Sequence, residues 1–99
     1  MNTSGGGTNV LTTELALELS LQPNVEGNTS FIEYSITEPD TGYVPIAWNV
    51  KSYTAETFLS SCMVVFIKKS GVWKMQFKNL NTIRTARFTG ILRIAWLKE

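Results

Sequence analysis

Pairs of carboxylates are the residues of this chain whose types and spacing come closest to a reactive site. Glu14 and Glu18 are four residues apart, and Glu38 and Asp40 flank a proline. Most glycoside hydrolases use two carboxyl groups that flank the bond to be cleaved. Here the first pair occupies the polar phase of a predicted strand, and the second lies in a predicted turn. We therefore expect both pairs to be solvated surface residues.

Nucleophiles and metal ligands are scarce. The chain contains no histidine and one cysteine, Cys62, which lies in an apolar run and is expected to be a buried, unreactive thiol. Without an imidazole, Ser60 and Ser61 lack the usual activating base and would need a lysine in its place. Zinc sites are built mainly from Cys and His ligands, and no glycine-rich phosphate loop opens a helix. We therefore predict no catalytic residue, no metal site and no cofactor.

Charge is unevenly distributed along the chain. Residues 1–50 carry six acidic and no basic side chains, and residues 51–99 carry nine basic and two acidic ones, so the halves have net charges of −6 and +7. A basic half with interleaved aromatic residues is one signature of nucleic-acid binding. The alternative is that acidic and basic strands lie side by side, or meet across a subunit boundary, where opposite charges attract. We favour this alternative and expect no nucleic-acid partner, because a fold that mixes the halves cancels most of the field.

The strands that would position these side chains are indicated by alternation of apolar and polar residues. Ninety-nine residues suffice for one domain. A helix is the competing interpretation of 15–21, but leucines spaced two apart share one face only in a strand. The sequence thus predicts an all-β fold, a single antiparallel β-sandwich of about six to eight strands. The segments that carry strand-like patterns are 15–21, 32–36, 44–50, 63–67, 73–77, 85–88 and 91–97.

Aromatic side chains divide into an expected core set and an expected exposed set. Trp48, Trp73 and Trp96 fall on the apolar phases of their strands, which predicts that they are buried. Residues 51–57 resemble a polar connection. Tyr53 and Phe58, which lie in or beside that connection, are therefore the candidates for an exposed contact.

Two residues near the middle of the chain have conformational roles that follow from their types. Gly42 is predicted to supply a turn conformation that other residues avoid. Pro45 cannot donate a backbone hydrogen bond, so its strand must begin near it or lie at the edge of a sheet. Tyr43, between them, is expected to bury its ring.

The N-terminus is predicted to be a flexible arm, residues 1–9, ahead of the sandwich domain at residues 10–99. Three consecutive glycines with Ser, Thr and Asn around them favour such an arm. The segment lacks the basic and apolar regions of a signal peptide. The longest uncharged apolar run, 58–67, is about half of the ~20 residues that a membrane-spanning helix needs, so we expect no membrane partner. The arm residues proposed to hold neighbouring subunits are Ser4, Gly5, Gly6, Gly7, Thr8 and Asn9.

The order of these elements resembles a small β-sandwich domain of tailed-bacteriophage structural proteins, which often ends tail-fibre, baseplate or head-fibre chains. The resemblance covers Leu19 to Glu99. The chain departs from the family between Val50 and Ser61, which lack its usual glycine and serine, and it is expected to be free-standing rather than the tip of a long fibre. The second departure favours an accessory protein over a receptor-binding tip. The matching features are the Glu26-Gly27-Asn28 turn, the Gly42-Tyr43-Val44-Pro45-Ile46 motif, a strand that ends at Asn79 and the closing Ala95-Trp96-Leu97-Lys98 segment.

The resemblance and the arm together imply a non-catalytic structural or accessory protein of a bacteriophage virion, such as a capsid decoration, head-fibre or tail component. It would form a homo-oligomer, with a trimer favoured, and attach to other virion proteins, having been assembled in the host cytoplasm. The alternative is a module that binds a host receptor or a host-surface glycan through exposed loops and Tyr53.

Overall fold

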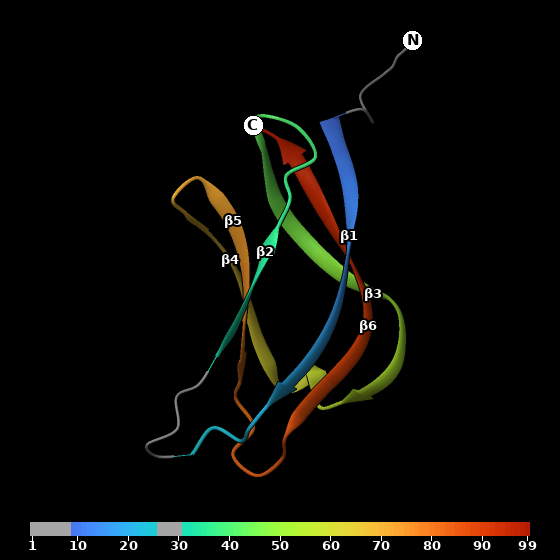
Figure 1. Cartoon of the computed structure of the whole chain (residues 1–99), viewed down its shortest axis with the longest axis vertical. Helices are drawn as coiled ribbons and strands as arrows, with labels where there is room; N and C mark the ends of the chain where they lie inside the picture. The colour runs from blue at the N-terminus through green and yellow to red at the C-terminus, as the bar shows by residue number, and fades with distance from the viewer. Residues whose placement is uncertain (1–8, 26–30) are drawn as a thin grey trace.

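Two antiparallel sheets make up the fold (Figure 1). The computed structural model describes residues 9–25 and 31–99, and within these residues it contains six strands and the short 3-10 helix η2 (Leu59–Ser61). The sheets have the strand orders β1-β6-β3 and β2-β5-β4, which confirms the predicted all-β antiparallel sandwich. The strands are β1 (Val10–Leu21), β2 (Ile32–Ile36), β3 (Tyr43–Thr57), β4 (Cys62–Lys69), β5 (Val72–Asn79) and β6 (Ala86–Lys98).

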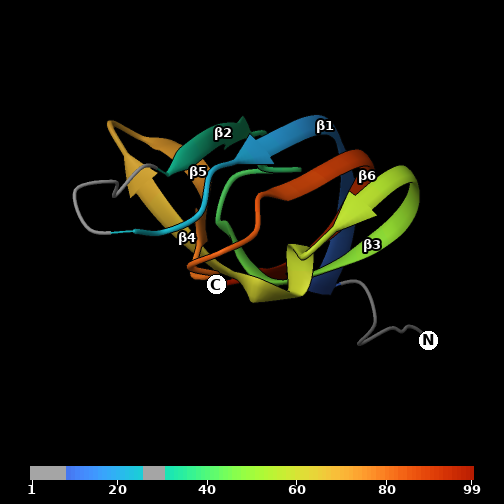
Figure 2. The ribbon, with the colours of Figure 1, turned by 90° about the horizontal axis from the view of Figure 1, so that it is seen from below.

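The sheets enclose one hydrophobic core, and the end-on view in Figure 2 shows β2 beside β1 on one side of it. The hydroxyl of Tyr34 in β2 donates a hydrogen bond of 2.8 Å to the backbone oxygen of Glu18 in β1. On the other side, η2 leads the chain from β3 into β4. The β1-β6-β3 sheet and the β2-β5-β4 sheet are thus connected at both margins.

Core residues are those that the alternating pattern selects. Leu17, Leu19 and Leu21 are buried on one face of β1, which confirms that this segment is a strand and not a helix. In β5, Met75 and Phe77 are fully buried. Their polar neighbours Lys74, Gln76 and Lys78 occupy the opposite phase and keep partial exposure.

The three tryptophans differ in depth. Trp96 is fully buried, whereas Trp48 and Trp73 are partly buried and pack against the core cluster. The prediction of a buried position is confirmed for Trp96 and only in part for Trp48 and Trp73, which lie at the margin of the core. Trp48 lies on β3 and Trp73 pairs with the edge strands on both sides of β5, so solvent reaches part of each ring.

The predicted polar connection at residues 51–57 is wrong, because this segment is the second half of β3. β3 pairs with β6 through Thr57. Its register shifts lie between Pro45 and Ala47, between Val50 and Ser52, and between Tyr53 and Ala55, and the last two fall in this segment. Such bulges break the period-two pattern by which strands are found in sequence. The two predicted strands at 85–88 and 91–97 are likewise one strand, β6, that runs through Gly90.

The Gly42–Ile46 motif lies against the end of the chain. Gly42 has a φ of 89° and turns the chain into β3, as predicted. The backbone N–H of Glu99 donates a hydrogen bond of 2.8 Å to the Gly42 oxygen, and Tyr43 pairs with Lys98. Tyr43 is buried, and Pro45 lies near the start of an edge strand, so both expectations for these residues are confirmed.

Opposite charges from the two halves of the sequence meet within one chain, as the preferred interpretation predicted. Lys51 Nζ lies 2.5 Å from Glu14 Oε2, and Lys69 Nζ lies 2.9 Å from Glu33 Oε1. The acidic strands β1 and β2 therefore sit in the same sheets as basic strands from the second half. The described part of the chain contains no helix that is long and apolar enough to cross a membrane.

Candidate functional site

The carboxylate pair on β1 lies on the outer face of its sheet. Glu14 and Glu18 are both exposed, with Ala16 between them on the same face. The hydrogen bond from Lys51, together with the charges of Lys51 and Arg93, lowers the pKa of Glu14 below its ordinary 4.5. A general acid needs the opposite shift, so this geometry favours an ion pair at Glu14 rather than proton transfer.

The carboxylate of Glu33 is also held in its ionised form. Gln76 Nε2 donates to Glu33 Oε1 at 2.9 Å, and Lys69 contacts both carboxylate oxygens at 2.9 and 3.2 Å. The hydrogen bonds from Gln76 and then Lys69 lower the pKa of Glu33. In the predicted turn, Asp40 accepts a hydrogen bond of 2.8 Å from the backbone N–H of Thr41, which is an ordinary turn contact.

The residues considered as nucleophiles have structural contacts. The Oγ of Ser61 is 2.7 Å from the backbone oxygen of Phe58 and 3.2 Å from Asn79 Oδ1. Cys62 is half-buried rather than buried as predicted, because it starts the edge strand β4, and burial raises the pKa of its thiol. Among residues 9–25 and 31–99, no group of three His, Cys, Asp or Glu side chains is placed to hold a metal ion.

The two side chains predicted to form an exposed contact are both exposed but belong to different surfaces. Tyr53 is 59% exposed and Phe58 is 41% exposed. Tyr53 projects from the bulged part of β3, whereas Phe58 adopts a left-handed conformation, with φ at 55°, just before η2. Glu56 holds this turn, because its Oε2 accepts a hydrogen bond of 3.0 Å from the N–H of Leu59. Tyr53 alone borders a hollow of appreciable size.

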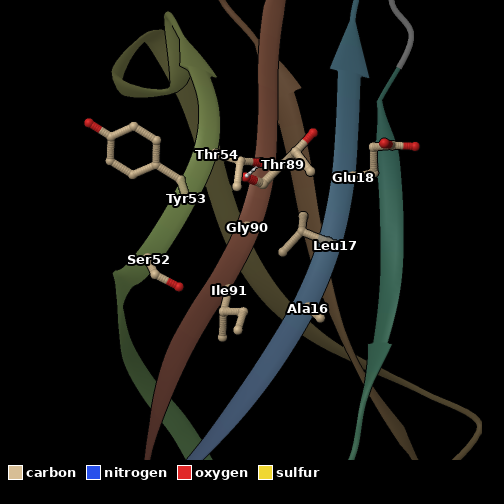
Figure 3. Close-up of a pocket in the computed structure, with 9 residues that line it drawn as sticks. All are labelled: Ala16, Leu17, Glu18, Ser52, Tyr53, Thr54, Thr89, Gly90 and Ile91. Carbon is tan, nitrogen blue, oxygen red and sulfur yellow. Dashed lines mark hydrogen bonds between the residues drawn. The ribbon is translucent and has the colours of Figure 1, made fainter.

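That hollow is a shallow depression of about 630 Å³ across β1, β6 and β3 (Figure 3). We call it the Gly90 depression. Gly90 lies at its centre, and a Cβ on this residue would be 2.3 Å from the backbone oxygen of Ser52. The absence of a side chain at Gly90 thus lets β3 bend closely over β6. The depression is lined by Ala16, Leu17, Glu18, Ser52, Tyr53, Thr54, Thr89, Gly90 and Ile91.

The Gly90 depression has a mixed lining of polar, apolar and aromatic residues. Its lining residues include Tyr53, Glu18 and several serine and threonine hydroxyls, and Thr54 Oγ1 lies 3.4 Å from the backbone oxygen of Thr89. In Figure 3 the Tyr53 ring points away from Gly90, and the Glu18 side chain projects past β1. Volumes of ~300–1,000 Å³ are typical of small-ligand sites. On the inner side of β3, Tyr53 also borders a second hollow of about 350 Å³ with Trp48 and Leu59. The sequence identified Tyr53, but a hollow built from three distant strands has no local signal.

Comparison of the chain with protein-family models, with curated proteins and with solved structures finds no match. The site is therefore interpreted from its own geometry.

A second surface of interest is an apolar row at the end of the first sheet. Val10, Leu97 and Val44 lie opposite one another on β1, β6 and β3, so their side chains share one face. Val10 is 45% exposed, Leu97 is 39% exposed, and Ile46, beside them at a bulge, is 51% exposed. We call these four residues the end patch.

The end patch lies where the predicted arm meets the domain. Asn9 is exposed and directly precedes β1. The other predicted assembly residues, Ser4, Gly5, Gly6, Gly7 and Thr8, lie outside the described residues.

Asn79 is a structural residue that sequence reasoning did not single out for a role beyond ending a strand. It is the buried polar residue of the described core. Its Nδ2 donates to the backbone oxygens of Leu21, Gln22 and Arg84 at 3.2, 3.2 and 2.9 Å, and its Oδ1 accepts from the N–H of Asn81 at 3.0 Å. One side chain thus joins the ends of β1, β5 and the connection to β6.

Proposed function

We propose that this protein is a non-catalytic structural or accessory protein of a bacteriophage virion, which acts by forming a homo-oligomer and by attaching to other virion proteins. The virion assignment is supported by the sequence resemblance from Leu19 to Glu99 and by the Gly42–Ile46 motif within it. Assembly through a terminal arm and an exposed sheet surface fits a domain of this size, because a small sandwich gains stability from contacts with neighbouring copies.

The end patch is the observation that carries this proposal. Apolar side chains on neighbouring strands form one continuous surface, and contiguous exposed apolar surfaces are typical of protein–protein contacts. The patch adjoins Asn9, so a chain held through residues 1–9 would bring the end patch against the same neighbour. The ionised, paired state of Glu14 and Glu33 is consistent with a protein that does no acid–base chemistry.

Sedimentation analysis of the full chain at micromolar concentration tests the proposal. We expect a homo-oligomer, with a trimer favoured by the sequence. Deletion of residues 1–9 should weaken the assembly while the far-ultraviolet spectrum keeps its β-sheet form. A chain that stays monomeric up to ~100 μM, far above the ~1 μM scale of moderate association, would contradict the assembly role.

A second candidate function, binding of a host-surface glycan or receptor, is favoured by the Gly90 depression. Tyr53, at the margin of this depression, is 59% exposed, and an exposed aromatic ring can stack on the apolar face of a sugar. A glycan array with the wild-type chain and Tyr53→Ala tests this function, and Phe58→Ala is the matched control. Binding that is lost with Tyr53→Ala and kept with Phe58→Ala would support it. Equal binding by all three proteins would remove the depression from consideration.

A further inference from the structure

The sandwich has four edge strands, and three of them carry features that prevent pairing with another chain. β1 presents Glu14 and Glu18, and the Glu18 backbone oxygen is occupied by Tyr34. β2 has five residues, and β3 contains Pro45 and three register shifts. Short strands, charges, prolines and bulges are the usual means by which sheet edges avoid association.

β4 lacks these features over its first six residues. It is the end strand of the order β2-β5-β4 and can be followed at the margin of its sheet in Figure 2. Its pairing with β5 is continuous over eight residues, and no charge or proline occurs between Cys62 and Ile67. On its outer face Met63 is 46% exposed and Val65 is 36% exposed, and Ile67 lies next in the same phase. From Cys62 to Ile67 this edge is regular, uncharged and apolar, and the two lysines of the strand lie at its end.

We propose that two copies of this chain associate through their β4 edges. The two β4 strands form an antiparallel pair centred on Val65, which joins the β2-β5-β4 sheet of one copy to that of the other. The inference rests on the proposed assembly role and names a contact separate from the arm. A second copy fits this edge because the strand is self-complementary. Residues opposite each other in an antiparallel pair share a face, so a two-fold pair must be centred on one residue.

The outer apolar residues select the centre of the pair. With Val65 opposite Val65 of the second copy, Met63 lies opposite Ile67 in both directions, and all three apolar side chains meet an apolar partner. Centring on Val64 would place Ile67 opposite Ser61, and centring on Phe66 would place Met63 opposite Lys69. The Val65 register is therefore favoured by burial of apolar surface.

The lysines at the end of β4 do not oppose this register. Lys68 falls opposite Cys62 of the second copy, and Lys69 falls opposite Ser61, so no two lysines face each other. Within its own chain, Lys69 is bound to Glu33, and Lys68 Nζ lies 5.5 Å from the centre of the Trp73 ring. Both cations are thus held by groups of their own subunit.

A disulfide at the two-fold centre provides the direct test. In the full chain, Cys62→Ser removes the native thiol and Val65→Cys introduces a single new one. Opposed residues in an antiparallel pair have Cα atoms about 4.5–5.5 Å apart, which lies in the range that a disulfide spans.

We expect Cys62→Ser/Val65→Cys to form a covalent dimer under mild oxidation at least about tenfold faster than Cys62→Ser/Val25→Cys. Val25 is the matched control because it is 49% exposed and lies in a loop. Equal rates would overturn the proposal.

The mass of a charged variant separates this contact from the wider assembly role. If residues 1–9 and the end patch hold a trimer, the β4 contact joins two trimers, so Val65→Lys should halve the mass of the wild-type assembly. Val25→Lys should leave that mass unchanged, and circular dichroism checks the folding of both variants. The β4 contact would be overturned, with the assembly role left standing, by either of two results. One is a wild-type oligomer whose mass is unchanged by Val65→Lys, and the other is a wild-type protein that forms a trimer and nothing larger. A wild-type monomer that forms no Val65→Cys dimer would overturn both.

Discussion

Trp96 Nε1 donates a hydrogen bond of 2.8 Å to Thr13 Oγ1, which joins the C-terminal end of β6 to β1 at a partly buried position. Trp73, in contrast, has a buried Nε1 with no hydrogen-bond partner among the described residues. An unpaired buried donor costs free energy, whereas a paired one contributes to stability. The two indoles therefore differ in what their N–H groups do for the fold.

This difference predicts unequal effects of the same substitution. Trp96→Phe removes a satisfied hydrogen bond and leaves Thr13 without its donor, and Trp73→Phe removes an unsatisfied donor. We expect Trp96→Phe to lower the free energy of unfolding by at least about 1 kcal/mol more than Trp73→Phe does. Urea denaturation followed by circular dichroism measures both, and equal losses would show that the Trp73 indole N–H has a partner in solution.

Gly90 is predicted to be intolerant of any side chain. Because its Cβ would meet the Ser52 oxygen at 2.3 Å, Gly90→Ala must push β3 away from β6. Steric overpacking of this kind costs roughly 1–3 kcal/mol. Ala16→Val is the matched control, since it adds atoms on the exposed face of the same sheet and should change stability by less than about 0.5 kcal/mol. Similar stability of the two variants would contradict the close approach.

The Asn79 side chain is predicted to hold the end of β1 and the connection before β6 against the end of β5. Asn79→Ala removes the buried hydrogen bond to the backbone oxygen of Leu21 and the part-buried one to that of Arg84, which costs about 1–3 kcal/mol. Asn49 is exposed on β3, so Asn49→Ala should be nearly neutral. Thermal unfolding compares the two. The interpretation of Asn79 fails if both variants melt at the wild-type temperature.

Acid is predicted to weaken the fold through Glu33. Its pKa in the folded state is lowered by Gln76 and then by Lys69, so its contribution to stability is complete above the ordinary value of 4.5 and is lost as pH falls through the folded-state pKa. An NMR titration of the Glu33 carboxyl carbon should give a pKa below 4.5, and Gln76→Ala should raise it. A titration that Gln76→Ala leaves unchanged would show that the Gln76 hydrogen bond does not form in solution.

Local periodicity was enough to predict much of the fold. Leu17, Leu19 and Leu21 on one side, and Met75 and Phe77 on the other, alternate strictly because each strand has one face in the core. The second half of β3 could not be predicted in this way. It is an edge strand with bulges, so its side chains at 51–57 are all exposed and carry no period.

The candidate surfaces could be predicted only in part. Exposure of Tyr53 and Phe58 followed from their polar surroundings, which local sequence does report. The Gly90 depression and the end patch depend on which strands pair and in what register, and Val10, Leu97 and Val44 are brought together by contacts across most of the chain. Glycine inside a strand is a known sign of close backbone approach, and it was the one local signal for Gly90.

The end patch is predicted to be an assembly contact that can be broken without loss of the fold. Leu97 occupies the middle strand of the patch, between Val10 and Val44, so a charge there would have to be desolvated in any contact that covers the row. Leu97→Asp should raise the dissociation constant of the oligomer at least tenfold, which corresponds to about 1.4 kcal/mol. Because Leu97 is already 39% exposed, the substitution should leave the melting temperature of the isolated domain nearly unchanged.

Ile83→Asp is the matched control, since Ile83 is 77% exposed and lies in the connection before β6, away from the row. Sedimentation at several concentrations distinguishes the two variants. Dissociation by Leu97→Asp alone would locate the contact at the end patch, whereas equal masses for both would leave the arm or β4 to hold the oligomer and would remove the observation on which the assembly role rests.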